Sequence, residues 1–248
     1  MFALSVSHPL ATASFIKAFN QSDISGKFIV ILLLVASAYC WMLIVMNWRA
    51  LNRAQRESGR FKYHFARENH PMNLHLQRKK FPHTPLFSIY DTACRGVVEE
   101  LSPAVENPDD LFIKGGLIQE AKLSPLKVDS IRDKIERRMA DEAVKLEGEL
   151  AYLGAAVNAA PFLGMFGTVL GVMSTFAEIG ESGSVVISEV APGISAALIT
   201  TVMGLVVALP ASIAYSVLGR KLRTLAVDMD NFTQEMNSLI RRHYLREY

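Results

Sequence analysis

Cysteine is scarce in this sequence. Only Cys40 and Cys94 occur among its 248 residues, the first in an apolar run and the second in a long polar segment. Two isolated thiols cannot form a disulfide framework, and neither lies in a cluster with the spacing of metal ligands. We therefore expect two ordinary thiols and no metal site.

The sequence motifs typical of catalysis are also lacking. No glycine-rich phosphate loop, HExxH or GxSxG is present. The loose group His64, His70, His75 and His83 matches no standard metal site. Acidic residues share this segment with the basic run 78–80, and no binding motif appears, which disfavours a nucleic-acid partner. We expect no enzyme activity, no catalytic residue and no cofactor.

Charge is missing from three long runs. Residues 28–48, 150–177 and 190–218 hold about 21, 28 and 29 uncharged residues, and a bilayer core needs about 20. These runs predict an all-α membrane protein with three transmembrane helices. We expect the second and third helices to be long and to extend into the cytoplasm.

The distribution of basic residues predicts the orientation. Only Lys17 and Lys27 precede the first run, whereas Arg49, Arg53 and Arg56 follow it closely. The positive-inside rule then predicts a short periplasmic or interfacial N-terminus at 1–27. The segments that follow on the chain alternate: a cytoplasmic segment at 49–127, a periplasmic loop at 178–189 and a cytoplasmic C-terminal helix at 219–248.

Two amphipathic stretches flank the longer runs. Ser124-Pro125 predicts a helix start, with 128–149 as a cytoplasmic helix that runs into the membrane. In the tail, an apolar heptad seam requires a partner helix. Its residues are Leu222, Leu225, Met229, Phe232, Met236 and Leu239. The tail either folds back on the 128–149 helix or packs against another subunit.

Small and polar residues form a stripe on each of the two later spans. On the second span the stripe includes Asn158, Pro161, Gly164, Gly167, Thr168, Gly171 and Thr175. On the third it includes Ala197, Thr201, Gly204, Ala208 and Tyr215. The large residues Phe162, Phe166, Val169, Met173 and Phe176 fall on the other side of the second span. Such stripes let helix backbones approach closely, or they line a passage.

Two threonines within these stripes lie at one predicted depth. At about 1.5 Å per residue, Thr168 lies about 13 Å below the outer end of its span, and Thr201 about 16 Å below that of its own. Each hydroxyl could simply bond its own backbone. Two at one level favour a shared polar layer in an ion pathway.

The spans contain no Asp, Glu, Lys, Arg or His at mid-depth. A proton or sodium pathway normally needs a titratable group inside the membrane. If this chain takes part in ion movement, a partner must therefore supply that group.

Two segments resemble a known family. APFLGMFGTVLGVM at 160–173 and APGISAALITTVMGLVVALPA at 191–211 closely resemble the signature spans of the TolQ/ExbB/MotA family. The three-span layout matches as well, and the likeness is weakest in 1–27 and in the proline-rich segment. The charged stretch 230–243 is more similar to TolQ than to ExbB or MotA.

The resemblance implies a subunit of an inner-membrane motor driven by the proton gradient. Such subunits form a ring, usually a homopentamer, around single-span TolR- or ExbD-like partners in the bilayer. A partner aspartate carries the proton, and the family's pore threonines fall on Thr168 and Thr201. Energy then passes to a TolA- or TonB-like protein directed to the outer membrane.

One position departs from the family pattern. Many TolQ and ExbB proteins carry a glutamate where this chain has Ala196, which leaves Thr168 and Thr201 as the main polar candidates. Two alternatives stay open: a membrane scaffold ring that conducts nothing, and a MotA-like flagellar stator subunit.

Overall fold

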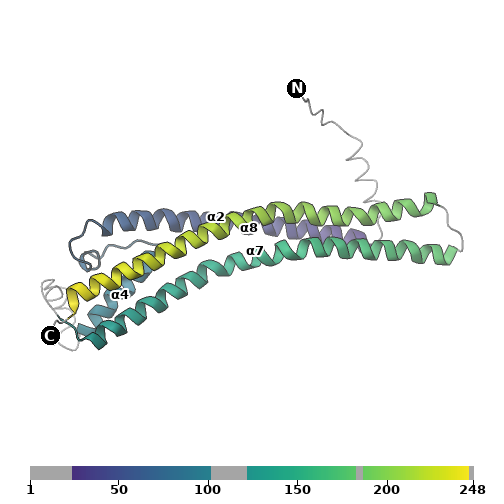
Figure 1. Ribbon diagram of the computed structural model, residues 1–248. Helices are drawn as coiled ribbons and strands as arrows, with labels where there is room; N and C mark the ends of the chain where they lie inside the picture. Colours follow the sequence, from purple (N-terminus) through teal and green to yellow (C-terminus); the bar gives the residue numbers. More distant parts are fainter. Residues whose placement is uncertain (1–23, 102–121, 183–186, 246–248) are drawn as a thin grey trace, which may run out of the picture. The chain divides into compact units, whose positions relative to one another are not determined.

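The long elements of the structure are helices (Figure 1). This computed structural model describes residues 24–101, 122–182 and 187–245. Its helices are α2 (Ile24–Phe65), α3 (Asn73–Leu76), α4 (Pro85–Leu101), α7 (Pro125–Ser182) and α8 (Ile187–Tyr244). Most of the predicted N-terminal segment 1–27, residues 183–186 of the predicted loop and residues 102–121 of the cytoplasmic segment lie outside the described residues.

Three of these helices are long and apolar enough to cross a membrane. The candidate spans lie within Gly26–Phe65, Pro125–Gly180 and Val190–Tyr244. The prediction of an all-helical chain with three such helices is confirmed for the described residues. α2 continues beyond the predicted span 28–48, through Arg49 to Phe65. The end of the span at residue 48 stays a prediction. α7 begins at Pro125, as the Ser124-Pro125 pair predicts.

The chain divides into two compact units. The apolar unit holds the described parts of Met1–Met46 and Leu150–Val217. The charged unit holds those of Asn47–Glu149 and Leu218–Tyr248. α2, α7 and α8 each contribute residues to both units.

In the apolar unit, α2 packs on the α7–α8 pair. Ile29 and Leu33 of α2 form a buried cluster with Ala160, Val207 and Ala208. The large residues of α7 that the sequence placed opposite its small stripe are exposed: Phe162, Phe166, Val169, Met173 and Phe176. An apolar surface of this extent suits a lipid environment or a partner protein rather than water.

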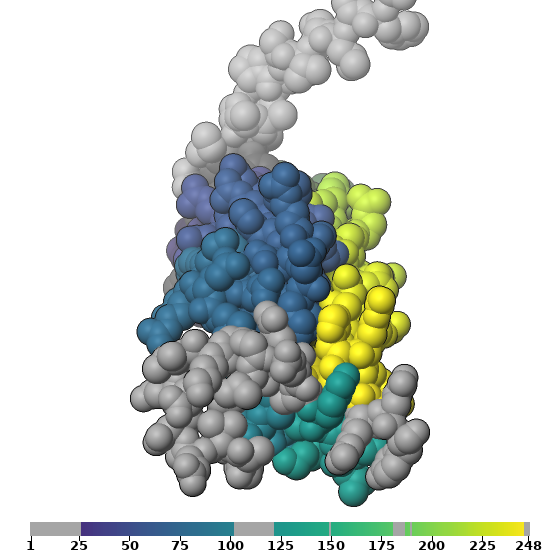
Figure 2. Space-filling model, turned by 90° about the vertical axis from the view of Figure 1, so that its left-hand side faces the viewer, coloured from purple at the N-terminus to yellow at the C-terminus, as the bar shows by residue number. Residues whose placement is uncertain are grey.

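Aromatic rings form the core of the charged unit. The ring of Phe61 in α2 lies 5.5 Å from that of Phe232 in α8 and 5.5 Å from that of Tyr90 in α4. The Lys62 ammonium donates to the Asp228 carboxylate over 2.6 Å beside this contact. Figure 2 shows the C-terminal part of α8 in yellow beside the blue part of α2.

The apolar seam of the tail is therefore covered within the same chain. Its buried residues are Leu222, Leu225, Met229, Phe232 and Met236. The ring contacts of Phe232 lie on α2, not on the 128–149 helix that the sequence analysis offered as a partner. The apolar stripe of that helix instead contacts α4, where the side chain of Ile131 lies against Gly96.

The cysteines lie in different units and both are free and buried. Cys94 belongs to the core of the charged unit, next to Tyr90. Burial raises the pKa of the Cys94 thiol well above its ordinary value. A hydrogen bond with Tyr90 lowers that pKa, but the effect of burial is larger. A thiol kept protonated in this way is a poor nucleophile.

A lysine and a tryptophan join α2 to α8 at one end of the charged unit. The Lys221 Nζ lies 3.5 Å from the centroid of the Trp48 ring. The same ammonium donates to the Asn52 Oδ1 over 2.6 Å. Tryptophan and lysine both favour the level of lipid headgroups, so this contact suits the interface that the sequence predicts at Trp48.

The C-terminal end of α8 is held by contacts near His70. The Leu123 N–H donates to the Tyr244 carbonyl over 2.7 Å, and the His70 and His243 rings lie 4.9 Å apart. The Met72 N–H donates to His70 Nδ1 over 3.3 Å. Burial, and secondarily the charge of His243, lower the pKa of His70.

This pKa shift predicts a pH-dependent C-terminus. The pKa of histidine in an unfolded chain is about 6.5. Because the pKa of His70 is lower in the folded state, the folded state loses stability as the pH falls below that unfolded-state value. Protonation also places a hydrogen on the Nδ1 that now accepts from Met72. We expect the Leu123 amide to exchange with solvent faster at pH 5.5 than at pH 7.5, relative to the intrinsic rate, in a hydrogen-exchange measurement.

The matched variant is His70→Asn, whose side-chain oxygen can accept from the Met72 N–H but does not titrate. It should weaken the pH response of the Leu123 amide. An unchanged response in His70→Asn would assign the effect to other groups.

Candidate functional site

Small residues bring α7 and α8 together along the apolar unit. Three contacts show the register: Gly154 lies against the Tyr215 ring, Gly167 against Thr200, and Gly171 against Ala197. As the residue number rises along α7, the number of the contacting residue on α8 falls by a similar amount, which shows that the two helices are antiparallel. The stripes of small residues predicted from the sequence thus face each other within one chain.

The two backbones come into close contact where Gly164 meets Gly204. A Cβ added to Gly164 would lie 2.7 Å from the Thr200 carbonyl oxygen, and one added to Gly204 would lie 2.7 Å from the Ala160 carbonyl oxygen. Real Cβ atoms essentially never lie so close to a backbone atom. Only glycine at both positions allows this helix contact.

The Thr168 and Thr201 hydroxyls meet at this crossing. Their Oγ1 atoms form a short hydrogen bond, and either can be its donor. Each hydroxyl also lies within reach of the Gly164 carbonyl oxygen, at 3.1 Å for Thr168 and 3.3 Å for Thr201. Both side chains are partly buried. The structure therefore brings together two residues that the sequence placed at one depth.

Thr200 is a third hydroxyl at the crossing, which the sequence analysis did not select. It is fully buried, and its Oγ1 lies 2.9 Å from the Gly164 carbonyl oxygen and 2.7 Å from that of Ala197. The sequence did contain a signal for Thr200, because it follows Ala197 of the small-residue stripe by one helical turn and so lies on the same face of α8. Thr200 faces α7, whereas Thr201 lies at the edge of the contact.

A count of hydroxyl protons defines what the threonine pair can do. Each hydroxyl carries one proton and two lone pairs. One proton serves the bond between Thr168 and Thr201, and the other can serve the Gly164 carbonyl. In this state the pair has only lone pairs left, so it accepts hydrogen bonds from an incoming group. It donates one only if the bond to Gly164 breaks.

The threonine pair opens onto a groove of about 590 Å³. Apart from the two threonines, its lining residues are Met165, Val169, Val172 and Met173. The sequence analysis placed Val169 and Met173 on the opposite side of the helix from Thr168. Thr168 instead lies at the boundary between the packed stripe and the exposed apolar face. Its hydroxyl therefore contacts α8 and also borders the groove.

The remaining predicted residues occupy three kinds of position. Gly164, Gly167, Gly171, Ala197 and Gly204 lie in the α7–α8 contact. Thr175, against Gly193, and Tyr215, over Gly154, belong to the same contact. Ala208 lies in the cluster with α2. Asn158 is exposed and Pro161 is partly buried. Most of the stripe thus packs helix on helix, and only its threonine edge borders the groove.

Ala196 is 3% exposed. It is absent from the groove lining, which belongs to Thr168, Thr201 and their apolar neighbours. This position therefore contributes packing within the chain and no polar group to the groove.

Comparison with known proteins identifies the family. The family model described as the MotA/TolQ/ExbB proton channel family matches residues 104–231, which is more than half of the chain. The chain belongs to this family. The match includes all of α7's apolar part and the first three quarters of α8, and so contains the threonine pair.

Curated relatives within the MotA/TolQ/ExbB family cover nearly the whole chain. The Tol-Pal system protein TolQ of Haemophilus influenzae is 27% identical over 94% of this chain and 96% of its own length. The biopolymer transport protein ExbB of Neisseria gonorrhoeae is 28% identical over 84% of this chain and 88% of its own. TolQ of Pseudomonas aeruginosa is 26% identical over 90% of each. With three apolar helices, this family membership supports a multi-pass protein of the bacterial inner membrane.

Proposed function

We propose that this chain is a subunit of a motor driven by the proton-motive force, of the TolQ/ExbB kind. Several copies, five in the usual arrangement of the family, form a ring around a TolR- or ExbD-like single-span partner. The partner's membrane aspartate carries the proton, and the motion passes to a TolA- or TonB-like protein. Family membership supports the proton-channel class, and the finer assignment rests on the geometry of the site.

The observation that carries the proposal is the hydroxyl pair at the edge of an apolar groove. Thr168 and Thr201 are polar groups beside Met165, Val169 and Met173. The spans supply no carboxylate at this depth. An arrangement that can bond a carboxyl group but cannot itself titrate suits a proton path whose carrier comes from elsewhere.

The hydroxyl protons suggest how the pair would treat each state of the carrier. A protonated partner carboxyl can donate to the free lone pairs of Thr168 or Thr201. After it loses its proton, the carboxylate needs a donor, and one threonine can turn from the Gly164 carbonyl toward it. The pair thus offers a hydrogen bond to both states, which lowers the cost of a charged carboxylate at membrane depth.

The proposed topology follows the distribution of charge. Arg49, Arg53 and Arg56 follow the first span, and Arg220 and Lys221 follow the third. We therefore place the charged unit, with the extensions of α7 and α8, in the cytoplasm and the N-terminus in the periplasm.

Proton uptake into vesicles tests the proposal. The chain would be reconstituted with its single-span partner, and a pH-sensitive dye would report uptake driven by a potassium diffusion potential. We expect uptake only when both proteins are present and the partner keeps its aspartate. A complex that assembles but takes up no more protons than the chain alone would instead support the non-conducting scaffold.

A further inference from the structure

The buried hydroxyl of Thr200 has two acceptors for its one proton. Its Oγ1 lies 2.9 Å from the Gly164 carbonyl oxygen on α7 and 2.7 Å from the Ala197 carbonyl oxygen on its own helix. Thr200 is 0% exposed, so bulk water does not compete for this proton. A hydroxyl proton rotates to suit its acceptors. Two directions are therefore open to it, one on each helix.

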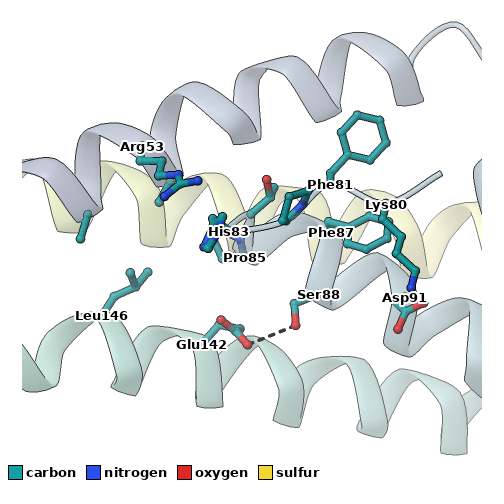
Figure 3. Close-up of a pocket in the computed structure, with 14 residues that line it drawn as sticks. Arg53, Lys80, Phe81, His83, Pro85, Phe87, Ser88, Asp91, Glu142 and Leu146 are labelled. Carbon is teal, nitrogen blue, oxygen red and sulfur yellow. Dashed lines mark hydrogen bonds between the residues drawn. The ribbon is translucent and has the colours of Figure 1, made fainter.

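Ser88 on α4 shows the opposite case. Its hydroxyl borders a cavity of about 620 Å³ in the charged unit and donates to the Glu142 carboxylate over 3.1 Å (Figure 3). The Arg138 guanidinium donates to the same hydroxyl oxygen from Nε over 2.8 Å. A charged donor and a charged acceptor thus fix the direction of the Ser88 proton. Both acceptors of Thr200 are neutral carbonyls, which leave its direction free to change.

The Gly164 carbonyl cannot serve every hydroxyl around it. Because α7 is a continuous helix, this oxygen accepts the helical N–H of Thr168 and keeps one lone pair. The hydroxyls of Thr168, Thr200 and Thr201 all lie within 3.3 Å of it. Three hydroxyls therefore compete for one lone pair.

Two proton arrangements follow from this competition. With the Thr200 proton on Ala197, the Gly164 carbonyl takes the second proton of the threonine pair, and the pair presents only lone pairs to the groove. With the Thr200 proton on Gly164, the threonine pair keeps its second proton and can donate it into the groove. Rotation of one buried hydroxyl thus changes the pair from an acceptor to a donor.

We propose that Thr200 is a positioning residue for the threonine pair, which supplies a proton to the Gly164 carbonyl when the pair donates into the groove. This rests on the proposed function, in which the group that receives that hydrogen bond is the partner's carboxylate. Thr200 is absent from the groove lining and acts only through the pair. Without its hydroxyl, each turn of the pair toward the groove would leave a buried lone pair of Gly164 unused, which disfavours the donor arrangement.

Nuclear magnetic resonance of the chain alone tests the competition at Gly164. Gly164–Met165 is the only Gly–Met pair in the sequence, so glycine labelled with ¹³C at its carbonyl and methionine labelled with ¹⁵N give a single bonded ¹³C–¹⁵N pair. A hydrogen bond moves the carbonyl resonance downfield. In Thr168→Val with Thr201→Val, we expect this resonance to stay within a line width of wild type, because the Thr200 hydroxyl takes the lone pair. Adding Thr200→Ala should move it upfield, whereas adding Thr200→Ser should not.

Proton uptake by the assembled complex tests what the arrangement does. Thr200→Ala should lower uptake about 2- to 10-fold, the range of one neutral hydrogen bond, whereas Thr200→Ser should retain it. Both variants remove the γ-methyl group, so the pair isolates the hydroxyl. Thr175→Ala and Thr175→Ser are the matched controls and should take up protons equally. Thr175 is also buried in the α7–α8 contact, and its hydroxyl donates to the Gly171 carbonyl over 2.9 Å away from the groove lining.

Two results would overturn the inference. One is a resonance that already moves upfield in the double valine variant and moves no further with Thr200→Ala, which would show that the Thr200 proton stays on Ala197. The other is equal uptake by Thr200→Ala and Thr200→Ser. The resonance is measured without the partner, so a failure of the proposed motor function would leave it unchanged and would be distinguishable.

Discussion

Replacing Thr168 and Thr201 together by valine is expected to lower proton uptake by the assembled complex about 10- to 100-fold. The estimate follows from the loss of a hydrogen bond to a charged group, about 1.5–3 kcal/mol, at a factor of ten per 1.4 kcal/mol. Valine keeps the shape of threonine and removes the hydroxyl. The groove would then offer the partner's carboxylate no donor and its protonated form no acceptor.

The measurement is dye-reported uptake in vesicles, with assembly checked by the size of the purified complex. The double serine variant at Thr168 and Thr201 keeps both hydroxyls and should retain most of the uptake. Thr224→Val is the matched control, because the Thr224 hydroxyl is exposed and donates to the Arg220 carbonyl of its own helix over 3.1 Å. Wild-type uptake by the double valine variant would show that the hydroxyls play no part in the proton path.

Replacing Gly164 or Gly204 by alanine is expected to destabilise the apolar unit by about 1–3 kcal/mol, the usual cost of overpacking. At each position the new Cβ would lie 2.7 Å from a backbone carbonyl oxygen of the facing helix, so a helix must move. Such a shift also separates Thr201 from Thr168. Uptake should therefore fall together with stability, whereas the valine variants should lose uptake alone.

Unfolding in sodium dodecyl sulfate, followed by circular dichroism, measures this effect. Gly180→Ala and Gly219→Ala are the controls, because nothing lies within 4 Å of a Cβ added at either helical position. Alanine favours a helix over glycine by about 1 kcal/mol, so these variants should be as stable as wild type or slightly more so. Equal stability in all four variants would mean that the helices do not approach as closely at Gly164 as the structure shows.

Much of the fold follows from local pattern. Three uncharged runs long enough for a bilayer predict the three long helices, and Ser124-Pro125 predicts the start of α7. The end of α2 was not predicted, because the change from apolar to charged residues after Trp48 marks the end of the apolar run and not the end of the helix, which continues to Phe65. The helical period also predicts which face of α7 carries its large residues.

The site was predictable in part. Helical spacing and rise place Thr168 and Thr201 on small faces at one depth, but they do not determine whether the two residues share a helix pair or meet across subunits. The fully buried hydroxyl of Thr200 and the apolar groove around Thr168 escaped prediction. Both depend on the rotation of one helix about its axis against its neighbour.

Sequence alone thus determined the helical class, the number of apolar helices, the family and the lack of a titratable residue at mid-depth of the predicted spans, because these depend on local composition and spacing. Tertiary structure decided which residues the small stripes face, where the tail seam is buried and that the hydroxyls of Thr168 and Thr201 meet within one chain. Those depend on contacts between segments far apart in the chain, which the order of residues does not encode locally.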